Sequence, residues 1–124
     1  MPRVIHFEIG VDEAGRALRF YEDVFGWRAR KWEGPEDYWL LVTGEGGPGI
    51  NGGLYRRHEG MSFDAHVNTI DVPSVEDYLA RVEAAGGKAV TKKITLPGVG
   101  HLAYCQDTEG NTFGIMQPDA TASA

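Results

Sequence analysis

The sequence predicts an α+β protein built from two βαβββ modules in tandem. Two segments, residues 14–25 and 75–85, place apolar side chains at helical spacing, and each lies between segments that read as strands. Shifting one half of the chain over the other by 61 positions superimposes these elements, with Ala14 falling on Val75. The common shift indicates that both halves follow the same order of strand, helix, extended segment and two further strands.

The composition fits one globular domain over residues 1–124, because 42% of the residues are hydrophobic. The net charge of −6 and the lack of a large basic cluster argue against nucleic acid, which requires Lys and Arg at phosphates. No apolar run is long enough for a membrane span, and the N-terminus lacks a signal-peptide pattern. Cys105 is the only cysteine, so no internal disulfide can form. We therefore expect a soluble cytoplasmic protein.

The first module starts with "FEIGV" (7–11), whose alternation predicts a strand. The helix over 14–25 follows, with Asp12 as its candidate N-cap and Gly26 at its end. The segment "RARKW" (28–32) reads as a strand. A hairpin with the glycine-rich turn "TGEGGPG" then joins the last two strands, "WLLVT" and "GGLY".

The second module repeats this order from "NTIDV" (68–72) onwards. Ser74 is a preferred cap for the helix over 75–85, and Asp77 stands at the reciprocal position of a capping box. The helix ends at a Gly-Gly pair, and "KAVTKK" (88–93) reads as a strand. The closing hairpin turns through "DTEGN", whose Asp, Gly and Asn suit a tight turn.

The shift continues through both hairpins without a gap. Leu41 falls on Leu102, and "GGLY" falls on "FGIM". The predicted segments are module one (3–56), a polar linker (57–62), module two (63–118) and a frayed tail (119–124).

The first strand carries the first candidate site residues. Its alternation sends Phe7 and Ile9 to one face and His6 and Glu8 to the other. An imidazole and a carboxylate on one face could hydrogen-bond a ligand, and Glu8 could act as a general base if burial raises its pKa. The alternative is a solvated strand face on which neither side chain does chemistry.

Tandem βαβββ modules in a chain of this length resemble the vicinal oxygen chelate superfamily. That superfamily includes glyoxalase I, bleomycin-resistance proteins, extradiol dioxygenases and methylmalonyl-CoA epimerases. The segments "HFEIGVDEAGRALRFYEDVFGW" and "DTEGNTFGIMQP" carry the resemblance, which covers nearly the whole chain. It implies two curved mixed sheets around a pocket with the helices outside, the modules pairing within one chain or across a homodimer.

In metal-dependent members of that superfamily, four side chains hold a divalent ion, one from the first strand and a carboxylate from the last strand of each module. His6 matches the first-strand position of module one. Its equivalent in module two is Val67, and His66 lies one residue away, on the opposite face. The last-strand positions match Gly53 and Gly114, which have no side chains.

One ligand of four remains, so we expect no divalent metal and no cofactor, since a catalytic site usually takes about three protein ligands. A rearranged metal site using His6, Glu8 and Asp71 is the alternative.

Five further positions complete the predicted ligand site. Gly53 and Gly114 would leave room where a ligand comes close to the backbone. Tyr55 and Met116 share their face and would form apolar walls, although core packing explains them equally well. Asp71 would meet a cationic group of the ligand, or it begins the turn into the second helix.

Several other residues receive a structural interpretation. His101 reads as exposed at a strand end, with the pocket mouth as the alternative, and Cys105 reads as a buried, inert thiol. Trp27 reads as packing, whereas Trp32 and Trp39 would line a pocket or a dimer interface. The loop "GEGGPG" has the letters of a dinucleotide fingerprint but leads into a strand, so it predicts no phosphate site.

The first functional hypothesis is a glyoxalase/bleomycin-resistance-like pocket protein that binds a small organic molecule without the family's metal. Its acidity favours a cationic or polar aromatic ligand. The second is an enzyme of the lyase, isomerase or dioxygenase kind that uses a non-standard metal site or Glu8 as its base. The third is a structural module without chemistry. We expect a homodimer in each case.

Overall fold

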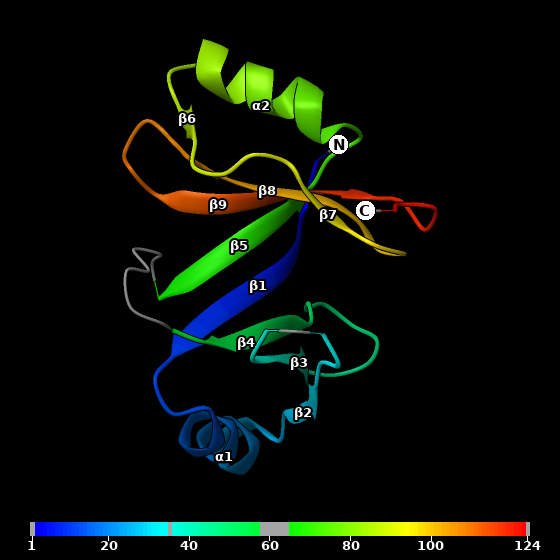
Figure 1. Cartoon of the computed structure of the whole chain (residues 1–124). Coiled ribbons are helices and arrows are strands. Elements are labelled where there is room, and N and C mark those ends of the chain that lie inside the picture. Colours follow the sequence, from blue (N-terminus) through cyan, green and yellow to red (C-terminus); the bar gives the residue numbers. More distant parts are fainter. Residues whose placement is uncertain (1, 35, 58–64, 124) are drawn as a thin grey trace. The chain divides into compact units, whose positions relative to one another are not determined.

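The computed structural model describes residues 2–34, 36–57 and 65–123. The chain divides into two compact units, His6–Val67 and Asn68–Ala124 together with Met1–Ile5. Each unit contains one helix and its own group of strands (Figure 1). Of the predicted linker 57–62, only Arg57 belongs to the described residues.

The first unit has a four-stranded mixed sheet and one helix. Its elements are β1 (Val4–Val11, whose first two residues are assigned to the other unit), α1 (Ala14–Phe25), β2 (Arg28–Lys31), β3 (Tyr38–Val42) and β4 (Gly52–Arg56). The strand order is β2-β3-β4-β1, with β1 parallel to β4 and the other neighbours antiparallel.

The second unit repeats this arrangement with one additional short strand. Its elements are β5 (His66–Asp71, whose first two residues are assigned to the first unit), α2 (Val75–Ala84), β6 (Lys88–Ala89), β7 (Ile94–Leu96), β8 (Gly100–Gln106) and β9 (Thr112–Pro118). The order is β5-β9-β8-β6, with β5 parallel to β9, and β7 pairs with β8. The predicted α+β fold of two βαβββ modules is confirmed.

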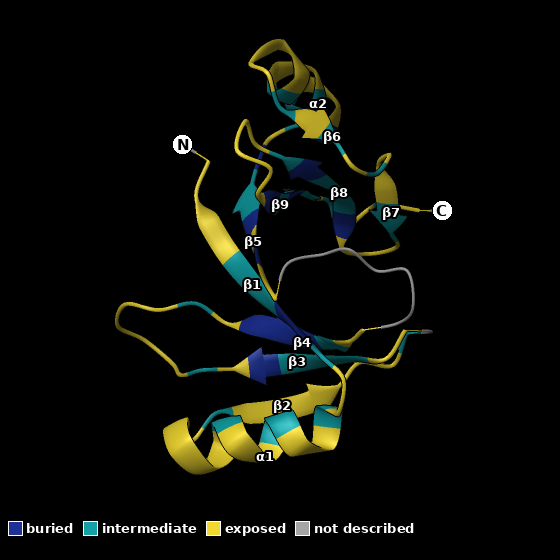
Figure 2. Ribbon diagram, turned by 90° about the vertical axis from the view of Figure 1, so that its left-hand side faces the viewer, coloured by how far each residue is buried: buried dark blue, intermediate teal, exposed yellow. Residues whose placement is uncertain are grey.

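Each helix covers one face of its own sheet and closes a small core. In the first unit, Ile9, Leu41 and Leu54 form the buried centre, and the apolar face of α1 packs against it. The centre of the second unit is Val72, Val75, Ala103, Cys105 and Ile115. Figure 2 shows the dark blue of buried residues on the strands, whereas α1 is entirely intermediate or exposed.

The helix ends follow local chemistry, with one correction. The Asp77 amide donates to Ser74 Oγ at 3.2 Å, as predicted for a cap, and Gly26 ends α1 in the left-handed conformation with φ 73°. The prediction that Asp12 caps α1 is wrong. Glu13 holds the N-cap position without a side-chain bond, and Asp12 instead accepts a hydrogen bond from Arg57 Nε at 3.1 Å.

The pairing registers confirm the repeat for the central strands and correct it for the hairpins. Glu8 pairs with Gly53 in the first unit as Thr69 pairs with Gly114 in the second, so the shift of 61 holds there. The shift of 61 fails in β3 and β8, the strands that precede β4 and β9. Leu41 pairs with Gly52, whereas Cys105, and not Leu102, pairs with the equivalent Phe113. The predicted match of Leu41 with Leu102 is therefore wrong, because the first hairpin loop is three residues longer.

The predicted strand over 88–93 is also only partly present. Pairing stops after Ala89, because the successive amides of Val90 and Thr91 both donate to the Tyr104 carbonyl, at 2.8 and 3.2 Å. Two residues opposite one are the mark of a bulge, which bends the strand away.

Candidate functional site

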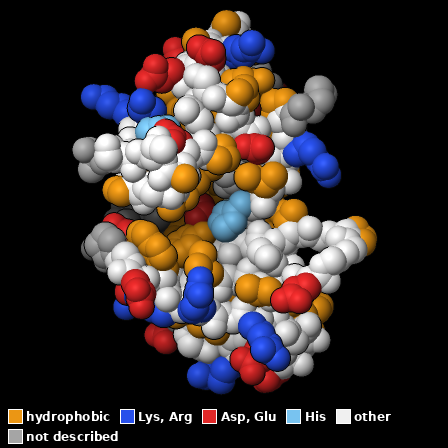
Figure 3. Space-filling view, turned by 90° about the vertical axis from the view of Figure 1, so that its right-hand side faces the viewer, with side chains coloured by type: hydrophobic (Ala, Val, Ile, Leu, Met, Phe, Trp, Pro, Cys, Tyr) orange, Lys and Arg blue, Asp and Glu red, His pale blue; other side chains and the backbone are white. Residues whose placement is uncertain are grey.

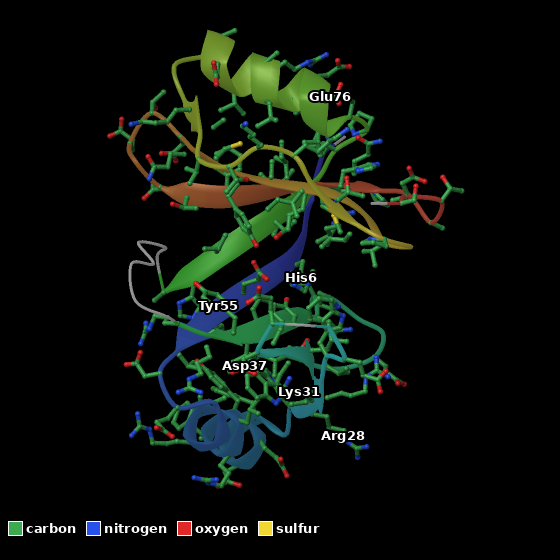
Figure 4. All side chains as sticks on the ribbon, in the orientation of Figure 1. His6, Arg28, Lys31, Asp37, Tyr55 and Glu76 are labelled. Carbon is green, nitrogen blue, oxygen red and sulfur yellow. The ribbon has the colours of Figure 1, made fainter. Side chains whose placement is uncertain are left out.

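The candidate site of the first unit is the face of its sheet that α1 does not cover. Gly53 on β4 lies between Glu8 and Leu40, and Tyr55 lies between Gly10 and Tyr38. Residues that pair across strands share a face. In Figure 4, His6 and Tyr55 lie on the side of the sheet away from α1. The prediction that His6, Glu8, Gly53 and Tyr55 share one face is therefore confirmed.

The Tyr38 side chain fills the space where, by the resemblance, metal-dependent members of the superfamily would place a carboxylate. The Tyr38 hydroxyl forms a hydrogen bond with His6 Nε2 at 2.8 Å. A Cβ on Gly53 would collide with the hydroxyl and ring of Tyr38, so the ring lies in the space that a side chain at position 53 would need. The place of the two ligands expected in this unit is thus taken by the His6 imidazole and the Tyr38 phenol, which are hydrogen-bonded to each other.

Burial lowers the pKa of His6 from its usual 6.5, because the charged imidazolium is poorly solvated there, while the nearby Glu8 carboxylate partly opposes this effect. The imidazole is therefore neutral at pH 7. Either tautomer of His6 can serve the bond, since the phenol both donates and accepts.

This shift predicts a pH dependence of stability. Because the folded pKa lies below the unfolded value, the unfolded chain takes up the proton first. The free energy of unfolding should fall as the pH drops below about 6.5 and through the folded pKa. In urea denaturation between about pH 5 and 8, His6→Gln should flatten this part of the curve. His66→Gln, which changes an exposed histidine, is the control and should leave this pH dependence unchanged. If His6→Gln also left the slope of the unfolding free energy against pH unchanged, His6 would not be its source.

Tyr55 occupies the other end of the same face. A Cβ on Gly10 would come within 2.8 Å of the Tyr55 hydroxyl and within 3.2 Å of Arg57 Cγ, so the side chain crosses β1 closely. A larger residue at position 10 would displace Tyr55. The glycine is thus needed for a close approach and not for a special backbone angle.

The second unit presents a matching face with different chemistry. Thr69 and Tyr104 flank Gly114, and Asp71 and Leu102 flank Met116. A Cβ on Gly114 would meet Thr69 Oγ1 at 3.1 Å and Tyr104 Cε1 at 3.4 Å, so this glycine is also closely packed. Neither glycine leaves the open floor that the sequence predicted for a ligand; tyrosine rings lie against both.

Asp71 also borders a hollow within the second unit. The hollow has a volume of about 690 Å³ and is lined by Tyr78 and Gln117 among others. Gln117 Oε1 accepts a hydrogen bond from the Val75 amide at 3.0 Å, so this side chain caps α2. Among the described residues that line the hollow, the Tyr78 phenol is the only titratable side chain besides Asp71.

The residues do not fit the divalent metal of the superfamily. His6 Nε2 is engaged by Tyr38, Tyr38 fills the space over Gly53, and Val67 and Gly114 offer no ligand atom. Within the described ranges, no group of three or more His, Cys, Asp or Glu side chains could hold a metal ion. His6, Glu8 and Asp71, all within these ranges, therefore do not form the rearranged metal site that was the alternative.

Other predicted residues have structural roles. His101 lies inside β8 and is only partly exposed, so the prediction of an exposed strand end is wrong; its nitrogens bond Thr95 Oγ1 at 3.2 Å and Asp119 Oδ2 at 3.3 Å. Cys105 is buried as predicted, and burial raises the pKa of its thiol. Trp39 packs on the core of the first unit. The rings of Trp32 and Tyr38 meet edge-on, with their centroids 6.2 Å apart.

No helix among residues 2–34, 36–57 and 65–123 is long and apolar enough to cross a membrane. On the face drawn in Figure 3, acidic, basic and hydrophobic side chains are interspersed, without a broad basic patch.

Tyr38 is the site residue that sequence reasoning missed. The segment "YWLLV" places Tyr38 and Leu40 on one face by alternation, which was visible in the sequence. What could not be read was the register. Only the pairing of Leu40 with Gly53 shows that the tyrosine ring reaches over the glycine.

The duplicated βαβββ fold, with a first-strand histidine on the uncovered face, defines a protein of the vicinal oxygen chelate class. The family model described as Glyoxalase/Bleomycin resistance protein/Dioxygenase superfamily matches residues 3–115. The chain belongs to this superfamily. It is 29% identical over 112 residues to a glyoxylase-like domain-containing protein of Didymella fabae, covering 87% of this chain and 88% of that protein.

The fold is shared with solved structures, including the following two. Methylmalonyl-CoA epimerase from Mycobacterium tuberculosis has a TM-score of 0.72 at 15% identity, covering 94% of this chain and 87% of that one. A hypothetical protein from Bacillus halodurans C-125 also has a TM-score of 0.72, at 16% identity, covering 99% of each chain. At such identities the likeness concerns the fold and not the activity.

Proposed function

We propose that this protein binds a small organic molecule on the uncovered face of its first unit and does so without a divalent metal. The observation that carries the proposal is the hydrogen bond between His6 and Tyr38 over Gly53. A protein that used the superfamily metal would need these positions for ligand atoms. Here they hold a neutral pair suited to hydrogen-bonding an organic group.

The chemistry of the face suggests what kind of ligand fits. Tyr38, Tyr55 and Leu40 supply apolar and aromatic surface, while the Glu8 carboxylate accepts hydrogen bonds and attracts positive charge. A ligand with an aromatic or apolar body and one donor or cationic group would use both. The net charge of −6 favours the same class.

The first prediction of this proposal concerns metal. We expect untagged protein purified without chelators to contain no stoichiometric nickel, zinc, iron or manganese by elemental mass spectrometry. Titration with Ni²⁺, Zn²⁺ or Mn²⁺ should leave the midpoint of thermal unfolding unchanged, because a ligand that binds only the folded state would raise it. Near-stoichiometric metal that His6→Ala removes would overturn the proposal.

The ligand itself is tested on protein kept in EDTA. We expect a panel of cationic aromatic and neutral aromatic compounds, with bleomycin and methylmalonyl-CoA as named probes, to include members that raise the thermal midpoint without metal. Tyr38→Ala should abolish the shift, whereas Trp27→Phe, a substitution on the α1 side, should leave it in place. Stabilisation that requires an added metal ion would decide against a metal-free site.

A second candidate is an enzyme of the lyase or isomerase kind with Glu8 as base. The observation in its favour is that Glu8 is partly buried and acts electrostatically on His6, so a carboxylate and a neutral imidazole lie on one face. Glu8→Gln would then abolish turnover while leaving ligand-induced stabilisation in place. Loss of both together would identify Glu8 as a binding residue only.

A further inference from the structure

Helix α1 carries large apolar side chains that its own unit leaves exposed. Phe20 and Val24 are each 56% exposed, and no residue of α1 is fully buried. Four residues apart, they lie one turn from each other on one side of the helix. By contrast, no residue of α2 is among the exposed large hydrophobic side chains.

The charges of α1 are arranged against the helix dipole. Arg16 and Arg19 lie in its first half and Glu22 and Asp23 in its second, with no acidic residue in the first turn and no basic residue in the last. Each charge near the wrong end of a helix destabilises that helix through its dipole. Helix α2 has the favourable order, with Glu76 and Asp77 in its first turn and Arg81 in its last. The charge order of α1 therefore does not serve the helix by itself.

Four residues form what we call the α1 stripe: Arg16, Phe20, Asp23 and Val24. All four are exposed. At 3.6 residues per turn, Asp23 comes two turns after Arg16 on the same side, about 10 Å along the axis, with Phe20 between them. Arg16 also lies near Asp12, whose carboxylate is already bound by Arg57. Neither Arg16 nor Asp23 makes a salt bridge within the described part of the chain.

We propose that the α1 stripe is an interface with a second copy of this chain, in which two α1 helices pack antiparallel about a two-fold axis. A two-fold interface brings the same patch of both subunits together, so the patch must be complementary to itself. With the axis crossing between positions 19 and 20, Arg16 of each subunit faces Asp23 of the other. Phe20 of each then lies beside the axis, where the two rings meet. This surface is separate from the face proposed to bind a ligand.

The shape beside the stripe also suits a second copy. A hollow of about 460 Å³ opens next to Phe20 and is lined by Ala17 and Tyr21 of α1 and by the end of β1. Its walls are mainly apolar, so it offers the partner helix a recess for an aliphatic or aromatic side chain. Arg16 and Glu13 also line this hollow, so charged groups are available there for salt bridges with a second copy.

The size of the contact sets the strength that we expect. A standard stable interface buries about 800 Å² on each partner, and a pair of 12-residue helices buries less. The dimer should therefore dissociate in the micromolar range, near Kd ~10 μM. Sedimentation velocity of the full chain between about 1 and 500 μM should show a monomer that converts to a dimer. Phe20→Asp should weaken association at least about tenfold without loss of fold, since the side chain is exposed.

Charge reversal tests the antiparallel pairing itself. Arg16→Asp would set two acidic side chains against each other in a homodimer, and Asp23→Arg would set two basic ones, so each variant alone should be monomeric. Mixed in equal amounts, the two variants should associate, because Asp at 16 then faces Arg at 23 and Asp23 faces Arg16. Glu22→Arg makes the same change of charge on the other side of the helix and should leave the wild-type dimer intact.

Three results would overturn the proposal. One is a wild-type chain that stays monomeric up to about 500 μM, well above the expected Kd. Another is a dimer that Phe20→Asp and both charge reversals leave unchanged, which would place the interface elsewhere. The third is a mixture of the two reversed variants that stays monomeric, which would exclude the antiparallel contact of Arg16 with Asp23. Circular dichroism of each variant confirms that its fold is retained.

Discussion

Leu54→Ala is expected to lower the free energy of unfolding of the first unit by about 3 kcal/mol, within the roughly 2–5 kcal/mol found for buried leucines. Leu54 is 0% exposed and lies at the centre of the core that α1 closes, beside Ile9 and Leu41. Truncation removes the transfer free energy of the side chain and leaves a cavity that the rigid sheet cannot close.

Urea denaturation followed by tryptophan fluorescence measures this effect where it occurs, because all three tryptophans belong to the first unit. Val42→Ala on the neighbouring strand β3 is the control. Val42 is 43% exposed, so its truncation should cost less than about 1 kcal/mol. A loss below that value for Leu54→Ala would mean that α1 does not close the core over β4.

Gly52→Ala is expected to destabilise the first unit by about 3 kcal/mol, at the upper end of overpacking effects. A Cβ at this position would lie 2.5 Å from the Phe7 carbonyl oxygen and 2.7 Å from its ring. Gly52 pairs with Phe7 in the parallel β1–β4 ladder, so the backbone itself would have to move. The same fluorescence-detected urea titration gives the change.

The adjacent glycine provides a matched comparison. A Cβ on Gly53 meets the Tyr38 ring and not the backbone, so Gly53→Ala should be rescued by Tyr38→Ala in a double-mutant cycle. Tyr38→Ala should not rescue Gly52→Ala, since Gly52 faces α1. Gly44→Ala, with no atom within 4 Å of its Cβ, should be neutral. If Tyr38→Ala rescued the stability of both Gly52→Ala and Gly53→Ala, or of neither, the positions assigned to Phe7 and Tyr38 would be contradicted.

The sequence was most informative where local chemistry decides the structure. Helix periodicity, the Ser74 cap and Gly26 predicted both helices, and alternation placed His6 and Glu8 on the face opposite Ile9. These features depend on neighbours a few residues apart. The errors arose where distant segments meet. The loop between β3 and β4 lengthens the first hairpin, and the Val90–Thr91 bulge shortens the sixth strand, and neither change alters the local pattern.

For the site, the missing side-chain ligands could be read from Gly53, Gly114 and Val67, because a side chain without a donor atom cannot coordinate a metal in any fold. What replaces them could not be read. The bond between Tyr38 and His6 joins residues 32 positions apart, and it forms only because Leu40 pairs with Gly53 and directs the tyrosine over the glycine.

The sequence by itself therefore determined the duplicated βαβββ order, the faces of its strands and the absence of donor side chains at Gly53, Val67 and Gly114. The tertiary structure decided which side chain fills the resulting space, and that the Phe20 and Val24 side of α1 remains exposed. The physical reason is that periodicity fixes the direction in which a side chain points. Register and packing between strands far apart in the chain fix what it meets there.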